Sequence, residues 1–359
     1  MTERCLVALG VLGALTVALV LAAIPLAAQA AAPAAKSSGA APKKPYSQPR
    51  TPDGQPDLQG FWTNSTYTSL ERPKNVTKEF YTLEEAAQAE KEAAARESEQ
   101  TVPGTVADVH YDLTQFGLDR SQSTHARNLR TSLIVDPPDG RLPAVTAEAQ
   151  KRAAEVAAAR KRMGGPLDAA ENLNLGERCV MMANVSPMLP MGYMSGYQIV
   201  QSPGYVMILS ERMHDFRVIP LDGRPHPPSQ VRPWKGDSRG RWEANTLVVE
   251  TTNFNSKRPG VGDNFAAGQA FRGASEDMRL TEWFTRVDAD TIQYRFTIDD
   301  PRTWVKPWTA EVPIMKDEIQ GPLFEHACHE GNYSVANMLK GAREAEKKAA
   351  EAAAKKSSK

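Results

Sequence analysis

Two residues suited to proton transfer, Glu211 and His214, lie close together in the segment Tyr205–Leu221. The apolar alternation around them predicts a β-hairpin that turns at Arg212 and Met213, which sets Glu211 directly opposite His214. We expect one side of this hairpin to be buried, and it pairs Leu209 with Phe216, Met207 with Val218 and Tyr205 with Pro220. A carboxylate and an imidazole buried together share a proton and can act as a general base. The alternative is a salt bridge at the hairpin end, without chemistry.

The other side of the hairpin and the segment Trp234–Trp242 offer candidate ligand-binding residues. Asp215 and Arg217 form a polar set that is either a binding surface or a solvated outer face. Arg241 and Trp242 belong to a run in which arginines alternate with tryptophans, and such side chains bind sugars or carboxylates by stacking and bidentate hydrogen bonds. The same stack could instead cap the mouth of a barrel structurally.

A third cluster lies in the segment Glu325–Asn332, which contains His329 and Glu330. The spacing of its histidines and cysteine is poor for a metal site, because a strand would put His326 and Cys328 on one face and His329 on the other. We therefore predict no metal and no cofactor. The sequence also contains no nucleophile elbow, phosphate-binding loop, dinucleotide fingerprint or zinc-protease helix, which removes most readily named enzyme classes.

The N-terminal segment predicts export. An uncharged apolar run from Cys5 to Ala23 ends at Pro25, and Ala28-Gln29-Ala30 resembles a signal-peptidase site, so we expect a signal peptide over residues 1–30 and a periplasmic or secreted protein. The alternative is an uncleaved membrane anchor, because the run is close to the ~20 apolar residues that span a bilayer. The charges balance, with 43 basic and 43 acidic residues, which argues against nucleic acid as a partner.

Cleavage of this signal peptide leaves two cysteines, Cys179 and Cys328. In an oxidising compartment two such residues most often form a disulfide. The bond would fix Glu177 and Arg178 beside His329 and Glu330, so that two carboxylates, an arginine and an imidazole gather at one place. This group is either a ligand-binding or catalytic cluster or a staple that holds the C-terminal segment to the rest of the fold.

Short runs rich in β-branched and aromatic residues dominate the second half of the chain. Their short connections make neighbouring runs antiparallel neighbours, which predicts a mainly β fold, an up-and-down barrel or half-barrel. The predicted strands are Tyr197–Gln201, Tyr205–Glu211, His214–Leu221, Gly240–Glu243, Thr246–Phe254, Met278–Val287, Thr291–Ile298 and Val305–Ile314. A glycine-rich excursion, Asn255–Asp277, interrupts them and is suited to a flap over one end of the barrel.

The remaining segments are predicted to surround this barrel. Residues 31–50 have the composition of a disordered linker, and residues 340–359 read as a charged tail, helical or disordered. Residues 51–192 supply an N-terminal strand, whose entry is Gln55–Trp62, and two surface helices, Tyr81–Glu97 with a capping box and Thr146–Met163. Residues 193–339 form the barrel domain and its stapling segment.

Several motifs resemble those of an uncharacterised family of secreted proteins from environmental, soil-type bacteria. They cover most of the chain and include Pro56–Trp62, Arg130–Arg141, Glu177–Cys179, Gln198–Gln201, His214-Asp215, Ile219–Arg224, Gly236–Glu243 and Cys328–Tyr333. The resemblance implies no known activity. His326 departs from an aromatic residue usual there, which leaves His329 the better site candidate. The strand plan separately resembles calycin or lipocalin barrels, as a likeness of fold alone.

These observations predict an exported barrel that binds a small organic molecule, such as a carbohydrate or an aromatic fragment. Arg178, Asp215, Arg217, Arg241 and Trp242 are the candidate ligand-binding residues. The alternative is a periplasmic lyase, hydrolase or isomerase in which His214 with Glu211 is the base, and His329 and Glu330 are further catalytic candidates. Arg178, Arg217 or Arg241 would neutralise developing negative charge. A structural role for every polar cluster is the third possibility.

Overall fold

A computed structural model describes residues 46–97, 128–173, 175–181, 186–190, 194–255, 274–317 and 323–357. The predicted signal peptide, the predicted linker up to Pro45 and most of the predicted flap lie outside these residues. The barrel strands and the segments that carry the candidate site residues lie within them.

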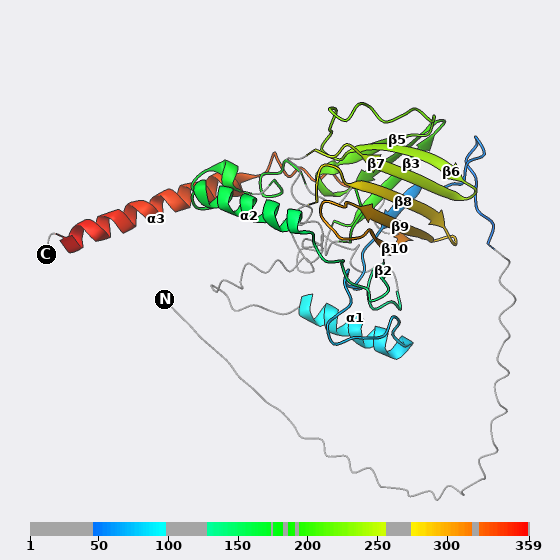
Figure 1. Cartoon of the computed structure of the whole chain (residues 1–359), viewed down its shortest axis with the longest axis horizontal. Coiled ribbons are helices and arrows are strands. Elements are labelled where there is room, and N and C mark those ends of the chain that lie inside the picture. Colours follow the sequence, from blue (N-terminus) through cyan, green and yellow to red (C-terminus); the bar gives the residue numbers. More distant parts are fainter. Residues whose placement is uncertain are drawn as a thin grey trace, which may run out of the picture. The chain divides into compact units, whose positions relative to one another are not determined.

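The described chain folds into a nearly closed antiparallel barrel of nine strands, which confirms the predicted mainly β class (Figure 1). The order around the barrel is β5-β4-β3-β1-β10-β9-β8-β7-β6, and a tenth strand, β2, pairs with β10. The strands are β1 (Gly60–Thr63), β2 (Ile134–Asp136), β3 (Gly196–Ser202), β4 (Tyr205–Ser210), β5 (Phe216–Pro220), β6 (Asp237–Glu243), β7 (Thr246–Thr252), β8 (Arg279–Arg286), β9 (Thr291–Asp299) and β10 (Trp308–Lys316).

The N-terminal strand β1 completes the barrel wall, because it lies between β3 and β10. Trp62 of β1 pairs with Tyr197 on one side and with Lys316 on the other. Its indole ring is fully buried and donates a hydrogen bond of 2.9 Å to the carbonyl of Leu58. The aromatic residue that marked this strand in the sequence therefore anchors it in the core.

The core occupies the barrel interior, where alternate residues of each strand meet. β9 shows the period of two most clearly: Ile292, Tyr294, Phe296 and Ile298 are buried, and the residues between them are more accessible. The rings of Phe284, Tyr294, Phe296 and Trp308 lie in a row, with neighbouring centroids 4.8, 5.5 and 5.7 Å apart. This aromatic row fills the side of the barrel formed by β8, β9 and β10.

The barrel has one seam without ladder hydrogen bonds, between β5 and β6, which are the two ends of the strand order. Side chains close it where Gly240 of β6 approaches Ile219 and Leu221. A Cβ atom at position 240 would lie 2.7 Å from both of those side chains, so glycine permits this close approach. The seam is therefore closed by apolar contact instead of by backbone pairing.

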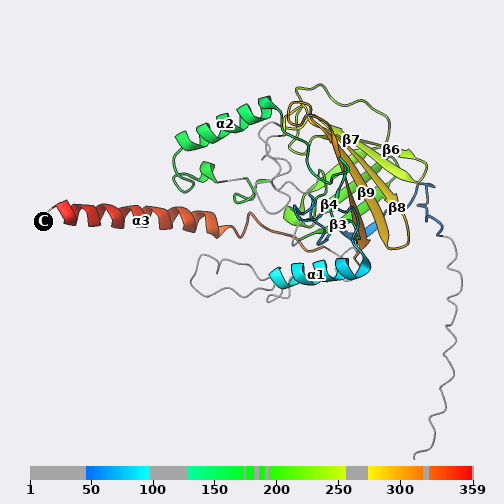
Figure 2. The ribbon, with the colours of Figure 1, turned by 60° about the horizontal axis from the view of Figure 1, so that its bottom comes forward.

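Three α-helices lie in the described residues: α1 (Leu83–Glu97), α2 (Ala147–Arg162) and α3 (Tyr333–Ser357), all labelled in Figures 1 and 2. The predicted capping box is confirmed, since the Thr82 hydroxyl accepts from Glu85 N and the Glu85 carboxylate accepts from Thr82 N. Helix α3 begins seven residues before the predicted tail (Tyr333 against Lys340). The reason is a cap, because the Asn332 side chain accepts from Val335 N at 3.4 Å.

Candidate functional site

The β4–β5 hairpin has the predicted register but the opposite orientation. Leu209 pairs with Phe216 and Met207 with Val218, as expected. The expected burial of this side is wrong: Phe216 is 54% exposed and Val218 is 47% exposed. The buried side instead carries Val206, Ile208, Ser210, Arg217 and Ile219. Both sides of the hairpin carry enough apolar residues to face the core. The side that contains Arg217 is the buried one because Arg217 has a charged partner inside the barrel.

The turn of this hairpin does not form the predicted buried acid–imidazole pair. It is a 3-10 turn over Arg212–His214, in which Met213 and His214 have left-handed φ values of 56° and 40°. The Glu211 carboxylate accepts a hydrogen bond of 3.1 Å from Gly196 N, whereas His214 is exposed. The turn is longer than the expected two-residue turn, so the two side chains are not held together against an apolar wall.

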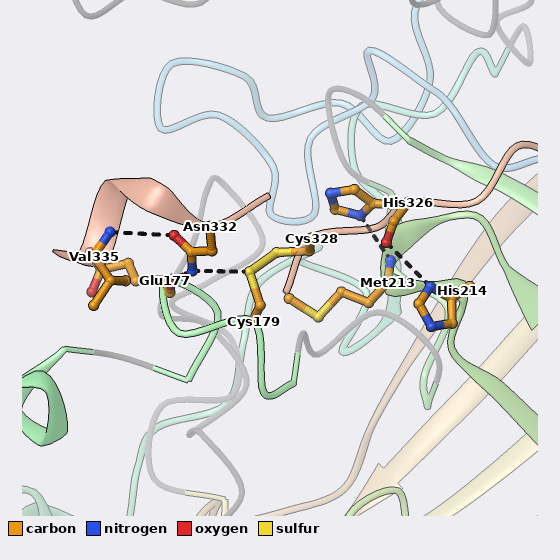
Figure 3. Close-up of a disulfide and its surroundings, with 8 residues drawn as sticks. All are labelled: Glu177, Cys179, Met213, His214, His326, Cys328, Asn332 and Val335. Carbon is orange, nitrogen blue, oxygen red and sulfur yellow. Dashed lines mark hydrogen bonds between the residues drawn. A yellow bond between two sulfur atoms is a disulfide. The ribbon is translucent and has the colours of Figure 1, made fainter. Parts of the chain in front are cut away.

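The predicted disulfide between Cys179 and Cys328 is present, with a Cα–Cα distance of 5.7 Å (Figure 3). It joins the turn that contains Arg178 to the segment that precedes α3. The Asn332 side chain reinforces this junction, because its amide donates to the carbonyl of Glu177 at 2.8 Å. The predicted staple is therefore part of the fold.

A cavity of about 310 Å³ lies beside the disulfide, and we call it the histidine pocket. It is lined by Cys179, Val180, Met213, His214, Asp215, His326, Cys328, His329 and Glu330. The structure thus brings together three of the four predicted catalytic residues, His214, His329 and Glu330. Glu211 and the predicted ligand residue Arg178 are not among its lining residues.

His326 links the C-terminal segment to the hairpin turn inside this pocket (Figure 3). Its Nδ1 accepts a hydrogen bond of 2.9 Å from Met213 N, so this nitrogen carries no proton. Its carbonyl oxygen lies 3.2 Å from His214 Nδ1. Burial, with the charge of Arg212 and the neighbouring His214, lowers the pKa of the His326 imidazole. Among the histidines that line this pocket, His326, which sequence reasoning ranked below His329, therefore has the best-defined partners.

A second cavity, of about 400 Å³, lies at one end of the β5–β6 seam, and we call it the seam pocket. It is lined by Val180, Met181, Asp215, Phe216, Arg217, Val218, Pro233, Trp234, Lys235, Gly236, Asp237 and Ser238. Asp215 and Val180 also line the histidine pocket, so the two cavities adjoin. The predicted ligand residues Asp215 and Arg217 are thus brought together in one cavity.

The charged side chains of the seam pocket are paired. Lys235 forms an ion pair with Asp215 and donates a hydrogen bond of 2.9 Å to the Phe216 carbonyl. Asp237 contacts His226 Nδ1 at 2.6 Å and Arg239 at 3.0 Å. These contacts fix the positions of both carboxylates at the rim of the seam.

Arg217 extends from β5 into the barrel and meets Glu282 of β8. The pair is bidentate, with distances of 2.6 and 2.7 Å, and both side chains are buried. Burial opposes the charge of Arg217, but the Glu282 carboxylate raises its pKa above the ordinary value. The Nε atom of Arg217 is buried and has no hydrogen-bond partner among the described residues.

Tyr294 extends this buried network. Its hydroxyl donates to Glu282 at 2.7 Å and accepts from Met188 N at 3.1 Å. Burial and the adjacent Glu282 charge raise the pKa of the Tyr294 hydroxyl, so it stays protonated and donates. The seam strand β5 is thereby connected through the barrel interior to β8 and β9.

The remaining two predicted ligand residues lie elsewhere. Arg241 is exposed and pairs with Glu243 at 2.8 Å and with Glu250 at 2.6 Å. Trp242 packs against the core, and neither residue lines the seam pocket. Arg241 is exposed and Trp242 packs inward because successive residues of a strand point to opposite faces of the sheet.

Sequence reasoning missed Glu282 and the pocket residues Phe216, Trp234 and Lys235. The signal for Glu282 was available, since it interrupts the buried side of β8 between Leu280 and Phe284. A carboxylate on such a side requires a charged partner. Trp234 and Lys235 belong to the tryptophan-rich segment that was recognised, but nothing in the sequence separated them from Arg241 and Trp242.

Comparisons with known proteins leave the chain without assigned relatives. No protein-family model, no curated protein and no solved structure matches the sequence. The resemblance to a secreted family therefore stays a prediction. Across the described ranges, no group of three or more potential metal ligands occurs. Likewise, no helix in the described part of the chain has the length and apolarity needed to cross a bilayer.

Proposed function

We propose that this protein binds a small organic molecule in the seam pocket. The observation that carries the proposal is the lining of this cavity, where accessible aromatic rings stand beside charged groups held in fixed positions. Phe216 and Trp234 are 54% and 39% exposed, and the Asp215–Lys235 pair lies between their segments. Ligand sites combine apolar walls with a few placed polar groups in cavities of roughly 300–1,000 Å³.

The position of the cavity in the barrel supports the same function. The seam is the part of the wall where no strand-to-strand ladder occupies the polar backbone groups of β5 and β6 on their facing edges. Arg217 joins the pocket to the interior and is itself held by Glu282. A rigidly held polar group costs a ligand little ordering entropy on binding.

We further propose that the protein acts in the periplasm or outside the cell. The Cys179–Cys328 disulfide supports this, because such bonds persist in oxidising compartments. Fractionation of the native producing cell, with non-reducing mass spectrometry of the recovered chain, tests it. Recovery in the cytoplasm with two free thiols at Cys179 and Cys328 would contradict the proposal.

A thermal-shift screen of small neutral and charged metabolites tests binding. A ligand present at 100 times its dissociation constant stabilises the folded state by about 2.7 kcal/mol, which raises the melting temperature measurably. Trp234→Ala should remove the shift, and Phe324→Ala should keep it, since Phe324 is 85% exposed and lies outside the pocket. A shift that survives Trp234→Ala would place the ligand elsewhere.

An enzyme is the second candidate function, and the adjoining histidine pocket favours it. His214, His329 and Glu330 line that cavity, which shares Asp215 with the seam pocket. A molecule in the seam pocket would therefore lie next to imidazoles and a carboxylate able to transfer protons. Once a ligand is known, His329→Gln should abolish its turnover and leave the melting temperature nearly unchanged. Retained turnover in that variant would remove the histidine pocket from catalysis.

A further inference from the structure

The charges in and around the seam pocket cancel. Lys235 is paired with Asp215, and Arg217 is paired with Glu282. Asp237 lies between His226 and Arg239. A ligand carboxylate or ammonium entering this pocket would lose hydration without meeting an uncompensated charge of the opposite sign. The pocket therefore disfavours both anions and cations.

The carboxylates of the seam pocket retain hydrogen-bonding capacity. Asp215 and Asp237 each have more acceptor sites than their basic partners occupy. The Arg217 side chain is buried and its guanidinium is held by Glu282, so it forms part of the pocket wall and is not a donor to the ligand. A ligand that fits must therefore supply uncharged donors for the carboxylates, and hydroxyl groups supply them.

Aromatic surfaces complete the lining. Phe216, the first residue of β5, and Trp234, in the segment before β6, both line the pocket with accessible rings, and the Lys235 ammonium lies 5.7 Å from the centre of the Phe216 ring. Aromatic faces carry negative charge density and attract weakly positive C–H groups. A pyranose ring offers such C–H faces together with a rim of hydroxyl groups. A plain aromatic fragment would fill the apolar part and leave the free acceptor sites of Asp215 and Asp237 without donors.

We infer that the ligand of the seam pocket is an uncharged carbohydrate, recognised by stacking on Phe216 and Trp234 and by hydrogen bonds to Asp215 and Asp237. This inference rests on the proposed function and narrows it to one ligand class. The charge pairs act as selectivity elements, because removing one member leaves its partner to attract a ligand of opposite charge.

Titration calorimetry on the full chain with five probes tests the class. The probes are methyl β-glucoside and cellobiose, which are neutral sugars, glucuronate and glucosamine, which are their charged counterparts, and benzyl alcohol, a neutral aromatic. A neutral sugar should bind at least about tenfold more tightly than either charged sugar and than benzyl alcohol, a difference of about 1.4 kcal/mol.

Two variants should change this selectivity in opposite directions. Asp215→Asn frees Lys235 and should improve the affinity for glucuronate relative to methyl β-glucoside by about tenfold. Lys235→Met frees Asp215 and should do the same for glucosamine. Both residues are partly accessible, so circular dichroism should show an unchanged fold. Glu346→Gln and Lys78→Met are the matched controls, because both break exposed ion pairs away from the pocket and should alter no preference.

The outcomes separate this inference from the proposed function. Equal affinities of wild type for glucuronate and methyl β-glucoside, or unaltered selectivity in both variants, would overturn the neutral-carbohydrate class. Binding of benzyl alcohol alone, lost in Trp234→Ala, would also overturn it while the small-molecule function stands. Failure of all five probes overturns the carbohydrate class, and only a wider metabolite screen without any Trp234-dependent shift would overturn the function as well.

Discussion

The wall formed by β8, β9 and β10 and the seam between β5 and β6 close the same barrel by different means. In the wall, β9 pairs with β10 from Trp308 opposite Ile298 to Met315 opposite Thr291, and the aromatic row fills the interior behind it. In the seam, the Gly240 backbone packs against Ile219 and Leu221 without a ladder. Every pocket group that we propose to contact ligand lies at the seam. The residues that we propose to bind ligand thus lie where β5 and β6 are not paired through their backbones.

One ion pair ties these two regions together. Arg217 belongs to the seam strand, and Glu282 belongs to the wall strand β8. Because the pair is buried, its two members depend on each other far more than exposed pairs do. The comparison between wall and seam can therefore be tested with substitutions that break individual contacts, taken in order from the strongest contact to the weakest.

The largest effect should come from the Arg217–Glu282 pair. Glu282→Gln leaves the Arg217 charge buried and uncompensated, which should lower the free energy of unfolding by about 3–5 kcal/mol in urea titrations. The double variant Arg217→Met with Glu282→Gln removes both charges, keeps an acceptor for Tyr294 and should regain most of that loss. Glu250→Gln, which breaks the exposed pair with Arg241, should cost below about 1 kcal/mol. Equal losses for Glu282→Gln and Glu250→Gln would show that the interior pair does not connect the regions.

The disulfide should rank second. Replacing both Cys179 and Cys328 by serine should lower the free energy of unfolding by about 2–4 kcal/mol, because the unfolded chain gains the freedom of a long loop. Far-ultraviolet circular dichroism should stay the same, since the bond joins segments outside the strands. Matching urea midpoints for the variant and the oxidised wild type would mean that the bond contributes nothing to the barrel.

The seam contact itself should give a smaller effect. Gly240→Val forces side-chain atoms against Ile219 and Leu221, and such overpacking typically costs about 1–3 kcal/mol. The substitution should also weaken binding in the seam pocket, because it pushes β5 and β6 apart. Gly341→Ala is the control, since the space around Gly341 in α3 is open. A Gly240→Val protein as stable as wild type would show that the strands already move apart freely.

The smallest effect should be a pH dependence from His326. The pKa of this imidazole is lower in the folded chain than in the unfolded chain, so the unfolded state binds more protons as the pH falls below about 6.5. The contribution of His326 is therefore complete above that value and is lost as the solution is acidified toward the folded pKa. The groups that face it are Arg212, His214 and the Met213 amide.

Comparing wild type with His326→Asn isolates this contribution. Asparagine places an oxygen acceptor near the position of Nδ1 but does not titrate, so the variant should show a flatter loss of stability between about pH 7 and pH 5. Histidines that do not face position 326 contribute equally to both proteins. If the free energy of unfolding changed with pH equally in both proteins, His326 and the Met213 amide would have to separate before the imidazole is protonated.

Local patterns in the sequence predicted much of this molecule. Alternation located eight barrel strands, the β4–β5 register followed from the turn position, the capping box marked the start of α1, and the cysteine count gave the disulfide. Each of these depends on residues near each other in the chain or on simple pairing of two cysteines. β2 was missed because three residues are too few to show a period.

The orientation of the β4–β5 hairpin could not be predicted, because its interior side carries a charged residue, Arg217, that local pattern assigns to the surface. The interior side is decided by Arg217, whose partner Glu282 belongs to a strand far along the chain. The candidate site could not be fully predicted for the same reason, because its residues come from segments far apart in the sequence. Asp215 and Arg217 were predicted, but the tryptophan and lysine that face them come from the segment before β6, and only the closed barrel brings these segments together.

The placement of β1 has a consequence for the covalent topology of the chain. The disulfide closes a ring that contains β3 through β10, whereas β1 lies outside it yet occupies the slot between β3 and β10. Strands β3 and β10 therefore stay within one covalent ring when β1 dissociates from the barrel. Reduction of the disulfide opens this ring and removes the link. We therefore expect the rebinding of β1, or its replacement by an added peptide of the same sequence, to depend on the oxidation state of Cys179 and Cys328.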